Sequence, residues 1–146
     1  MSSETDLIKL YSGKILKMAA EPIHRERLSE PDASATKRSP LCGSAVTVDI
    51  NVESGFITHY GQDVRACALG QASSTIIGKS IIGRSITEVS KAYEELSEML
   101  KNNGPTPSEP FDDLYVLKPA AEYKNRHASI LLPLEATLAA FQKIED

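Results

Sequence analysis

The chain contains no tryptophan, and aromatic residues make up only 5% of its 146 positions. Leucine, isoleucine, valine and alanine must therefore fill the core, which a chain of this length is large enough to bury. The longest apolar candidate, 130–134, is far shorter than the ~18 residues that a membrane span requires. The N-terminal residues show no basic segment followed by a long apolar one. We therefore expect no membrane partner, no secretory signal and a cytoplasmic protein.

Basic residues are scattered rather than clustered, and the formal net charge is −4. A basic patch or stripe is the usual footprint of nucleic-acid binding, so we do not expect nucleic acid as a partner. The segment GKSIIGRS lacks the spacing of a phosphate-binding loop. No G-x-S-x-G motif and no acid–base pair marks a catalytic centre, which predicts a protein that is not an enzyme.

Alternating apolar residues predict a strand over Ala45 to Val52 and a second strand over Phe56 to Val64. The turn residues Glu53-Ser54-Gly55 between them favour an antiparallel hairpin. Residues 5–20 show helical spacing. The connection over 21–40 is expected to be irregular, apart from a short strand around 35–37.

After Cys67 the hydrophobic spacing becomes helical, which predicts one helix that ends at Gly83 and another that begins at Thr87. Short helices are expected over 111–117, 120–132 and 133–144, unless Pro133 only kinks one continuous helix. The resulting fold class is α+β in a single domain over residues 1–146. We expect a small antiparallel sheet of about three strands, covered on one face by an N-terminal helix and several C-terminal helices.

The chain has two cysteines, Cys42 and Cys67. A disulfide is not expected in the cytoplasm, and two inert buried thiols are the simplest alternative. Cys67 lies where a strand ends and a helix begins, so unpaired amides and the helix dipole favour its thiolate, with Arg65 nearby. Cys42 precedes the first hairpin strand and Cys67 follows the second. An antiparallel hairpin therefore predicts that the two thiols lie at the same edge.

Three histidines are candidates to join these thiols. His24 is expected to be exposed in the charged connection, and His59 lies in the middle of a predicted strand. His127 lies near the start of a predicted helix. Two thiolates and one imidazole suit zinc or an iron–sulfur cluster, although three ligands leave one tetrahedral position open.

The segments LCGSAVTVDINVESGFITHY and ACALGQASS resemble the iron–sulfur cluster assembly scaffolds of the IscU, SufU and NifU N-terminal type. In that family a Cys-Gly turn leads into a hairpin, and a second cysteine begins a helix rich in small residues. Cys42-Gly43 matches the first element and Cys67 the second. The sequence HASIL, which begins at His127, matches the third element.

Two positions depart from the family pattern. Ser44 stands where the family has an aspartate, and Ala128 stands where it has a third cysteine. The motif Leu-Pro-Pro-Val-Lys, which IscU-type scaffolds offer to a chaperone, is also missing before His127. The proline-rich stretch 103–110 resembles the SufU branch, which points to a SUF-type setting.

The resemblance implies a scaffold or carrier that binds iron or a [2Fe–2S] cluster through Cys42 and Cys67, with His127 as an optional third ligand. The residues Gly43, Ser44, Arg65 and Ala128 would lie beside these ligands. A zinc-binding sulfur acceptor of SufU type and a metal-free adaptor of the assembly machinery are the alternatives. The implied partners are a cysteine desulfurase, other assembly proteins and apo-proteins that accept clusters.

Overall fold

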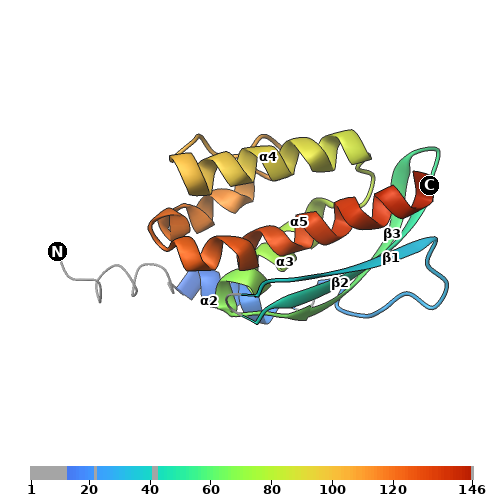
Figure 1. Cartoon of the computed structure of the whole chain (residues 1–146), viewed down its shortest axis with the longest axis horizontal. Helices are drawn as coiled ribbons and strands as arrows, with labels where there is room; N and C mark the ends of the chain where they lie inside the picture. The colour runs from blue at the N-terminus through green and yellow to red at the C-terminus, as the bar shows by residue number, and fades with distance from the viewer. Residues whose placement is uncertain (1–12, 22, 41–42, 146) are drawn as a thin grey trace.

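The computed structural model describes residues 13–21, 23–40 and 43–145 of the chain (Figure 1). It confirms the expected α+β class: one three-stranded antiparallel sheet carries helices on one of its faces. Within the described residues, no helix is both long enough and apolar enough to cross a membrane. In chain order the elements are α2 (Gly13–Ala20), β1 (Ala33–Arg38), β2 (Ala45–Glu53), β3 (Phe56–Arg65), α3 (Ala68–Ser80), α4 (Ile86–Asn102), the 3-10 helix η1 (Asp112–Glu122) and α5 (Lys124–Glu145).

The central strand β2 pairs antiparallel with both β1 and β3, which confirms the predicted hairpin. Ala45 lies opposite Arg38 on one side and opposite Arg65 on the other. The end of β1, the start of β2 and the end of β3 therefore meet at one end of the sheet. The predicted short strand is longer than expected, so the irregular connection before it is correspondingly shorter.

The core lies between this sheet and the helices. Val46, Val48 and Ile50 alternate along β2 and are fully buried, as the period-two pattern predicted. Helices α3 and α5 both contact the sheet and each other, while α4 lies over α5 (Figure 1). This layering brings the N-terminal ends of α3 and α5 close to the end of the sheet where the three strands meet.

The helix boundaries differ in part from the expected ones. Helix α3 ends before Gly83, and Ser85 rather than Thr87 caps α4, in a capping box with Glu88. Of the two alternatives for the last third, the continuous helix is correct, because α5 runs through Pro133. Predicted helical residues before Gly13 lie outside the described part of the chain.

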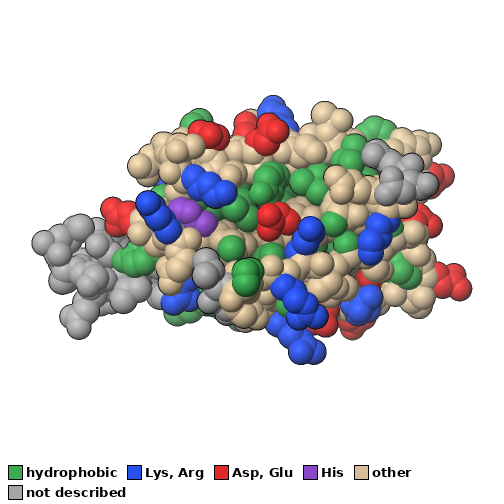
Figure 2. All heavy atoms as spheres, viewed as in Figure 1, with side chains coloured by type: hydrophobic (Ala, Val, Ile, Leu, Met, Phe, Trp, Pro, Cys, Tyr) green, Lys and Arg blue, Asp and Glu red, His purple; other side chains and the backbone are tan. Residues whose placement is uncertain are grey.

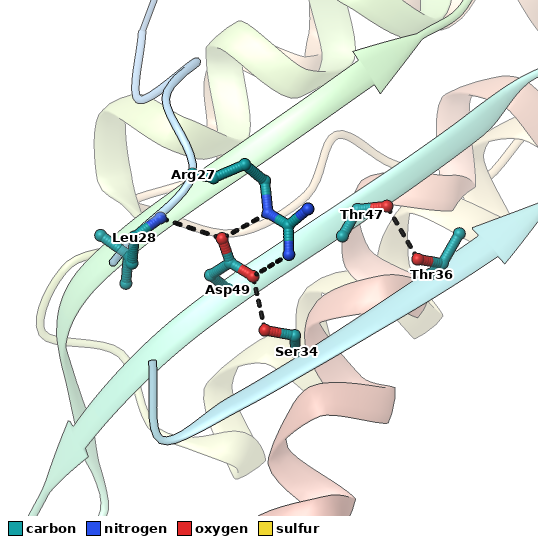
Figure 3. Close-up of polar contacts among 6 residues, drawn as sticks. All are labelled: Arg27, Leu28, Ser34, Thr36, Thr47 and Asp49. Carbon is teal, nitrogen blue, oxygen red and sulfur yellow. Dashed lines mark hydrogen bonds and ion pairs between the residues drawn. The ribbon is translucent and has the colours of Figure 1, made fainter. Parts of the chain in front are cut away.

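The outer face of the sheet carries one fully buried carboxylate, Asp49 of β2 (Figure 3). Arg27 donates to it from Nε at 2.6 Å and from Nη2 at 3.0 Å. The Leu28 amide and the Ser34 hydroxyl donate at 3.0 Å and 2.5 Å. Asp49 thus fastens the segment before β1 across this face of the sheet.

Candidate functional site

Cys67 occupies the position between β3 and α3 and is the N-cap residue of α3. Its backbone is extended, with φ −66° and ψ 172°. The change from strand to helical periodicity at this point predicted the location. Cys67 is only partly buried, and its thiol is free among the residues that the structure describes.

The Cys67 thiol lies among hydrogen-bond donors. Burial by itself raises its pKa, but hydrogen bonds from the Gly70 amide, the Ser129 hydroxyl, the Arg126 side chain and the Leu69 amide outweigh that effect. The net pKa of the thiol is therefore below its ordinary value. This confirms that the start of α3 favours a thiolate, which is the form that attacks electrophiles and binds metals.

Helix α5 approaches α3 closely at this point because Gly70 has no side chain. A Cβ atom added to Gly70 would overlap the Ser129 hydroxyl and come within 2.7 Å of the Ala66 Cβ. Pro133 has no N–H group, so the Ser129 carbonyl, four residues earlier in α5, lacks the amide donor that it would normally have in a helix. The next carbonyl, of Ile130, accepts a 2.6 Å hydrogen bond from the Ser73 hydroxyl.

The β1–β2 loop reaches the same place. Ser44 Oγ lies 3.1 Å from Ser129 Oγ, which in turn lies 3.6 Å from Cys67 Sγ. Both serines are buried. The loop closes through hydrogen bonds from the Ser39 amide to the Ser44 carbonyl, 2.8 Å, and from the Gly43 amide to the Ser39 carbonyl, 3.0 Å. Gly43 lies in this loop just before β2 and has φ +71°, a conformation that favours glycine.

Cys42 precedes Gly43 directly in sequence but lies outside the described residues. The predicted juxtaposition of the two thiols therefore stays a prediction. The structure nevertheless brings together the chain segments that flank each cysteine, since Ser44 and Cys67 both contact Ser129. We call Ser44, Cys67, Arg126 and Ser129 the thiol cluster.

Three other predicted site residues, His127, Ala128 and Arg65, form no side-chain hydrogen bond with this cluster in the described structure. The His127 side chain is 6% exposed, and its Nε2 donates to the carbonyls of Ala120 and Ala121 at 3.0 and 3.1 Å. His127 and Ala128 line a cavity between α4 and α5 instead. Arg65 is exposed at the end of β3.

His24 and His59 are also exposed. His24 packs edge-on against Tyr60, and the His59 ring bonds the neighbouring Thr58 hydroxyl. Among the residues that the structure describes, no three histidine, cysteine or acidic side chains converge as a metal site would require. This finding does not bear on a site that uses Cys42.

Sequence reasoning missed two residues of the thiol cluster, Arg126 and Ser129. They are three positions apart on α5 and therefore lie on the same face of the helix, which faces Cys67. The helical spacing was visible in the sequence, but the start of the helix was not. Because the first residue of α5 could not be predicted, the sequence did not indicate which face of the helix would contact α3.

The family model described as "NifU-like N terminal domain" matches residues 10–128 of the chain. Among curated proteins, the chain is 27% identical over 90 residues to the iron–sulfur cluster assembly scaffold protein IscU of Thermotoga maritima. That match covers 62% of this chain and spans 63% of the length of the relative.

Two solved structures resemble the whole fold. A nitrogen-fixing NifU-like protein (N-terminal) from Brucella abortus is 40% identical, with a TM-score of 0.92, and the match covers 96% of this chain and 97% of that one. A putative iron–sulfur cluster assembly scaffold protein for the SUF system from Fervidobacterium islandicum is 18% identical, with a TM-score of 0.80 over 92% and 98% of the two chains. The second likeness concerns the fold alone.

Proposed function

The chain belongs to the NifU-like N-terminal domain family, and we propose that it is a scaffold or carrier in iron–sulfur cluster assembly. Its cargo, iron or a [2Fe–2S] cluster, would be held through the thiolates of Cys42 and Cys67. The observation that carries the proposal is the Cys67 thiol, which is partly exposed and whose pKa is lowered by four hydrogen-bond donors. A thiolate is the ligand that iron–sulfur clusters require.

The side chains at this site provide two strong ligands for such a cargo, the two cysteine thiolates, rather than four. The hydroxyls of Ser44 and Ser129 keep their protons at neutral pH and are hard oxygen donors, so they hold iron or zinc poorly. His127 is the predicted third ligand and would have to bind through Nδ1, because Nε2 donates to two carbonyls. A partner protein or a small thiol would fill the remaining position. Incomplete ligation suits a carrier, because a cluster has to leave as well as bind.

The proposed partners follow from the family. A cysteine desulfurase would supply sulfur, and apo-proteins would accept the finished cluster. A SUF-type setting is part of the proposal, supported by the proline-rich stretch 103–110. The likeness to the Fervidobacterium scaffold adds only that the two chains share a fold.

The test is anaerobic reconstitution of the full chain with ferrous iron and sulfide. Visible absorption and the iron and sulfide content would be measured for the wild type, Cys42→Ala and Cys67→Ala. We expect the charge-transfer bands to be lost in both cysteine variants. The matched control is His59→Ala, which removes an exposed imidazole on β3, and it should keep the bands. A visible spectrum that is the same in the wild type and in both cysteine variants would contradict the proposal.

The same assay decides the role of His127. If its imidazole is a ligand, His127→Asn should lower the cluster content and shift the visible bands, whereas His59→Ala does neither. Far-ultraviolet circular dichroism of each variant checks that the fold is intact. Equal cluster content and equal spectra in His127→Asn and the wild type would leave a two-thiolate site.

A metal-free adaptor is the second candidate, and the contact between Ser44 and Ser129 favours it. Two hydroxyls bond each other at 3.1 Å beside Cys67, and an adaptor would need no metal ligand there. Metal analysis of protein purified without added metal distinguishes the candidates, since a zinc-binding sulfur acceptor would retain zinc. For an adaptor, a chelator should leave the thermal unfolding midpoint unchanged, and Cys67→Ser should still bind a desulfurase.

A further inference from the structure

A cavity of about 480 Å³ lies between α4 and α5, on the side of α5 that carries Ala128. Its volume is in the range of small-molecule sites. The lining is part apolar and part charged, and the thiol cluster does not contribute to it. The lining residues are Tyr93, Lys101, Lys124, His127, Ala128, Leu131 and Glu135.

The two ends of this cavity carry opposite charges. Lys101 and Lys124 lie at one end, and Glu135 lies at the other, where it accepts a 3.2 Å hydrogen bond from the Tyr93 hydroxyl. The Glu135 contact places residue 93 of α4 beside residue 135 of α5. Because the helices run in opposite directions, residue 101 then falls beside residue 127.

Figure 2 shows this face of the molecule. Basic side chains and a histidine lie toward the left end of the band between α4 and α5, and an acidic side chain lies further right over α5. Apolar side chains lie between these two ends. The picture therefore agrees with the order of the lining residues along the two helices.

None of these end charges is neutralised within the described chain. Neither lysine forms an ion pair there, and Glu135 has only the Tyr93 hydroxyl as a partner. The Tyr93 pKa is raised, first by burial and then by the negative charge of Glu135. An acidic group at the basic end and a basic group at the Glu135 end would each gain a partner.

His127 contributes a further polar atom at the basic end. Its ring is more than nine-tenths buried, and Nε2 is held by the Ala120 and Ala121 carbonyls. This fixes the proton on Nε2 and the orientation of the ring. Within the described residues, Nδ1 has no hydrogen-bond partner, so in the metal-free chain it can bind a polar group of a ligand.

The spacing of the two ends sets the length of the ligand. Residues 127 and 135 are eight positions apart on α5, which corresponds to about 12 Å along a helix. An extended tripeptide spans roughly 10 Å. Between the ends, Ala128 and Leu131 offer an apolar wall. We propose that this cavity binds a short zwitterionic peptide, with its carboxylate at Lys101 and Lys124 and its ammonium at Glu135.

The test is a titration of the metal-free, ¹⁵N-labelled full chain, followed by amide chemical shifts. The probes are trialanine, which carries both terminal charges, N-acetyl-trialanine, which keeps only the carboxylate, and trialanine amide, which keeps only the ammonium. We expect saturable shifts in α4 and α5 with trialanine. Each blocked peptide should bind roughly tenfold more weakly, because it lacks one charge-assisted hydrogen bond.

Variants assign each terminus to its end of the cavity. Glu135→Gln should weaken trialanine but not N-acetyl-trialanine, and the double variant Lys101→Gln, Lys124→Gln should weaken trialanine but not trialanine amide. The matched controls are Glu53→Gln and Lys37→Gln, which change exposed charges on the sheet and should have no effect.

Three outcomes would overturn the proposal. The first is the absence of saturable shifts at millimolar trialanine. The second is equal binding of trialanine and N-acetyl-trialanine, which would indicate a site for the C-terminal tail of a protein. The third is displacement of trialanine by inorganic phosphate with equal affinity, which would indicate an unselective anion site. None of these results depends on cluster binding, so each is distinguishable from a failure of the proposed function.

Discussion

The surroundings of Asp49 and of Cys67 use the same kinds of donor around one ionisable group. Asp49 receives hydrogen bonds from an arginine, a serine hydroxyl and a backbone amide (Figure 3). Cys67 likewise receives them from an arginine, a serine hydroxyl and backbone amides. The difference is access: Asp49 is fully buried, whereas Cys67 is partly exposed.

That difference separates a structural carboxylate from a thiol that is still partly exposed. The Asp49 carboxylate is enclosed by its donors, so its hydrogen bonds can only stabilise the fold. Cys67 keeps part of its surface exposed, so the same kinds of donor lower the pKa of a thiol that is not enclosed. Changes around Asp49 should therefore alter stability, and changes around Cys67 should alter reactivity.

The largest effect should come from Asp49→Ala. It leaves the Ser34 hydroxyl and the Leu28 amide without their acceptor, and it releases Arg27 from the sheet. Loss of a buried, hydrogen-bonded charge predicts a fall of about 2–4 kcal/mol in the free energy of unfolding, measured with urea. The control Asp63→Ala removes an exposed carboxylate from β3. A loss in Asp49→Ala as small as in the control would contradict the anchoring role.

Gly70→Ala should have the next largest effect and should act on both properties. The added Cβ would overlap the Ser129 hydroxyl, so α3 and α5 would have to move apart at a cost of about 1–3 kcal/mol. The Cys67 thiol should also react more slowly with iodoacetamide, because its donors from Gly70 and Ser129 shift. Gly78→Ala is the control in the same helix, since the nearest atom there is the Ile23 Cγ2 methyl at 3.1 Å, which requires a much smaller shift. Equal stability of the two variants would show that α5 does not depend on the close approach at Gly70.

Acid should weaken the Asp49 contacts by a smaller amount than the alanine variant does. The Asp49 pKa is lowered in the folded state: burial opposes ionisation, but hydrogen bonds from Arg27, Ser34 and Leu28 outweigh it. The corresponding stability is fully present above the unfolded pKa, about 3.9, and is lost as the pH falls through the lower folded pKa. Asp49→Asn should therefore show a flatter decline in the urea midpoint below that pH. Parallel declines in variant and wild type would contradict this assignment.

The sequence predicted the features that depend on local pattern. Alternation and a turn located the hairpin, and the change of period after it located Cys67 at the start of a helix. The burial of Asp49 was not predictable in this way. Its position in the alternation placed it on the face opposite the core, and it is buried only because the segment with Arg27 and Leu28 crosses that face. Such a contact joins residues more than 20 positions apart and leaves no periodic signal.

The same limit applies to the thiol cluster. The match to HASIL directed attention to His127 and Ala128, yet the residue that faces Cys67 is Ser129. A shift of one residue turns a helical side chain by about 100°, so the start of α5 decides which of these three meets α3. That start follows from the end of η1 and from packing against Gly70, which are properties of the folded chain rather than of the motif.

The smallest change, Ser129→Ala, tests the cluster most directly. It removes one hydroxyl donor to the Cys67 sulfur, so the thiol pKa should rise and less thiolate should be present at neutral pH. The pH dependence of iodoacetamide alkylation, measured in a Cys42→Ala background, should move to higher pH, with a several-fold lower rate at neutral pH. Ser129→Thr keeps a hydroxyl and should restore part of the rate.

Ser73→Ala is the matched control for that experiment. Ser73 is as buried as Ser129 and also links α3 to α5, through the Ile130 carbonyl, but it does not contact the sulfur. Its loss should lower stability by about 1 kcal/mol or more and leave the alkylation profile in place. If both serine variants shifted the profile equally, the effect would come from helix packing rather than from the Ser129 hydroxyl. The contrast with Asp49 would then rest on access alone, because the donors around Cys67 would not set its reactivity.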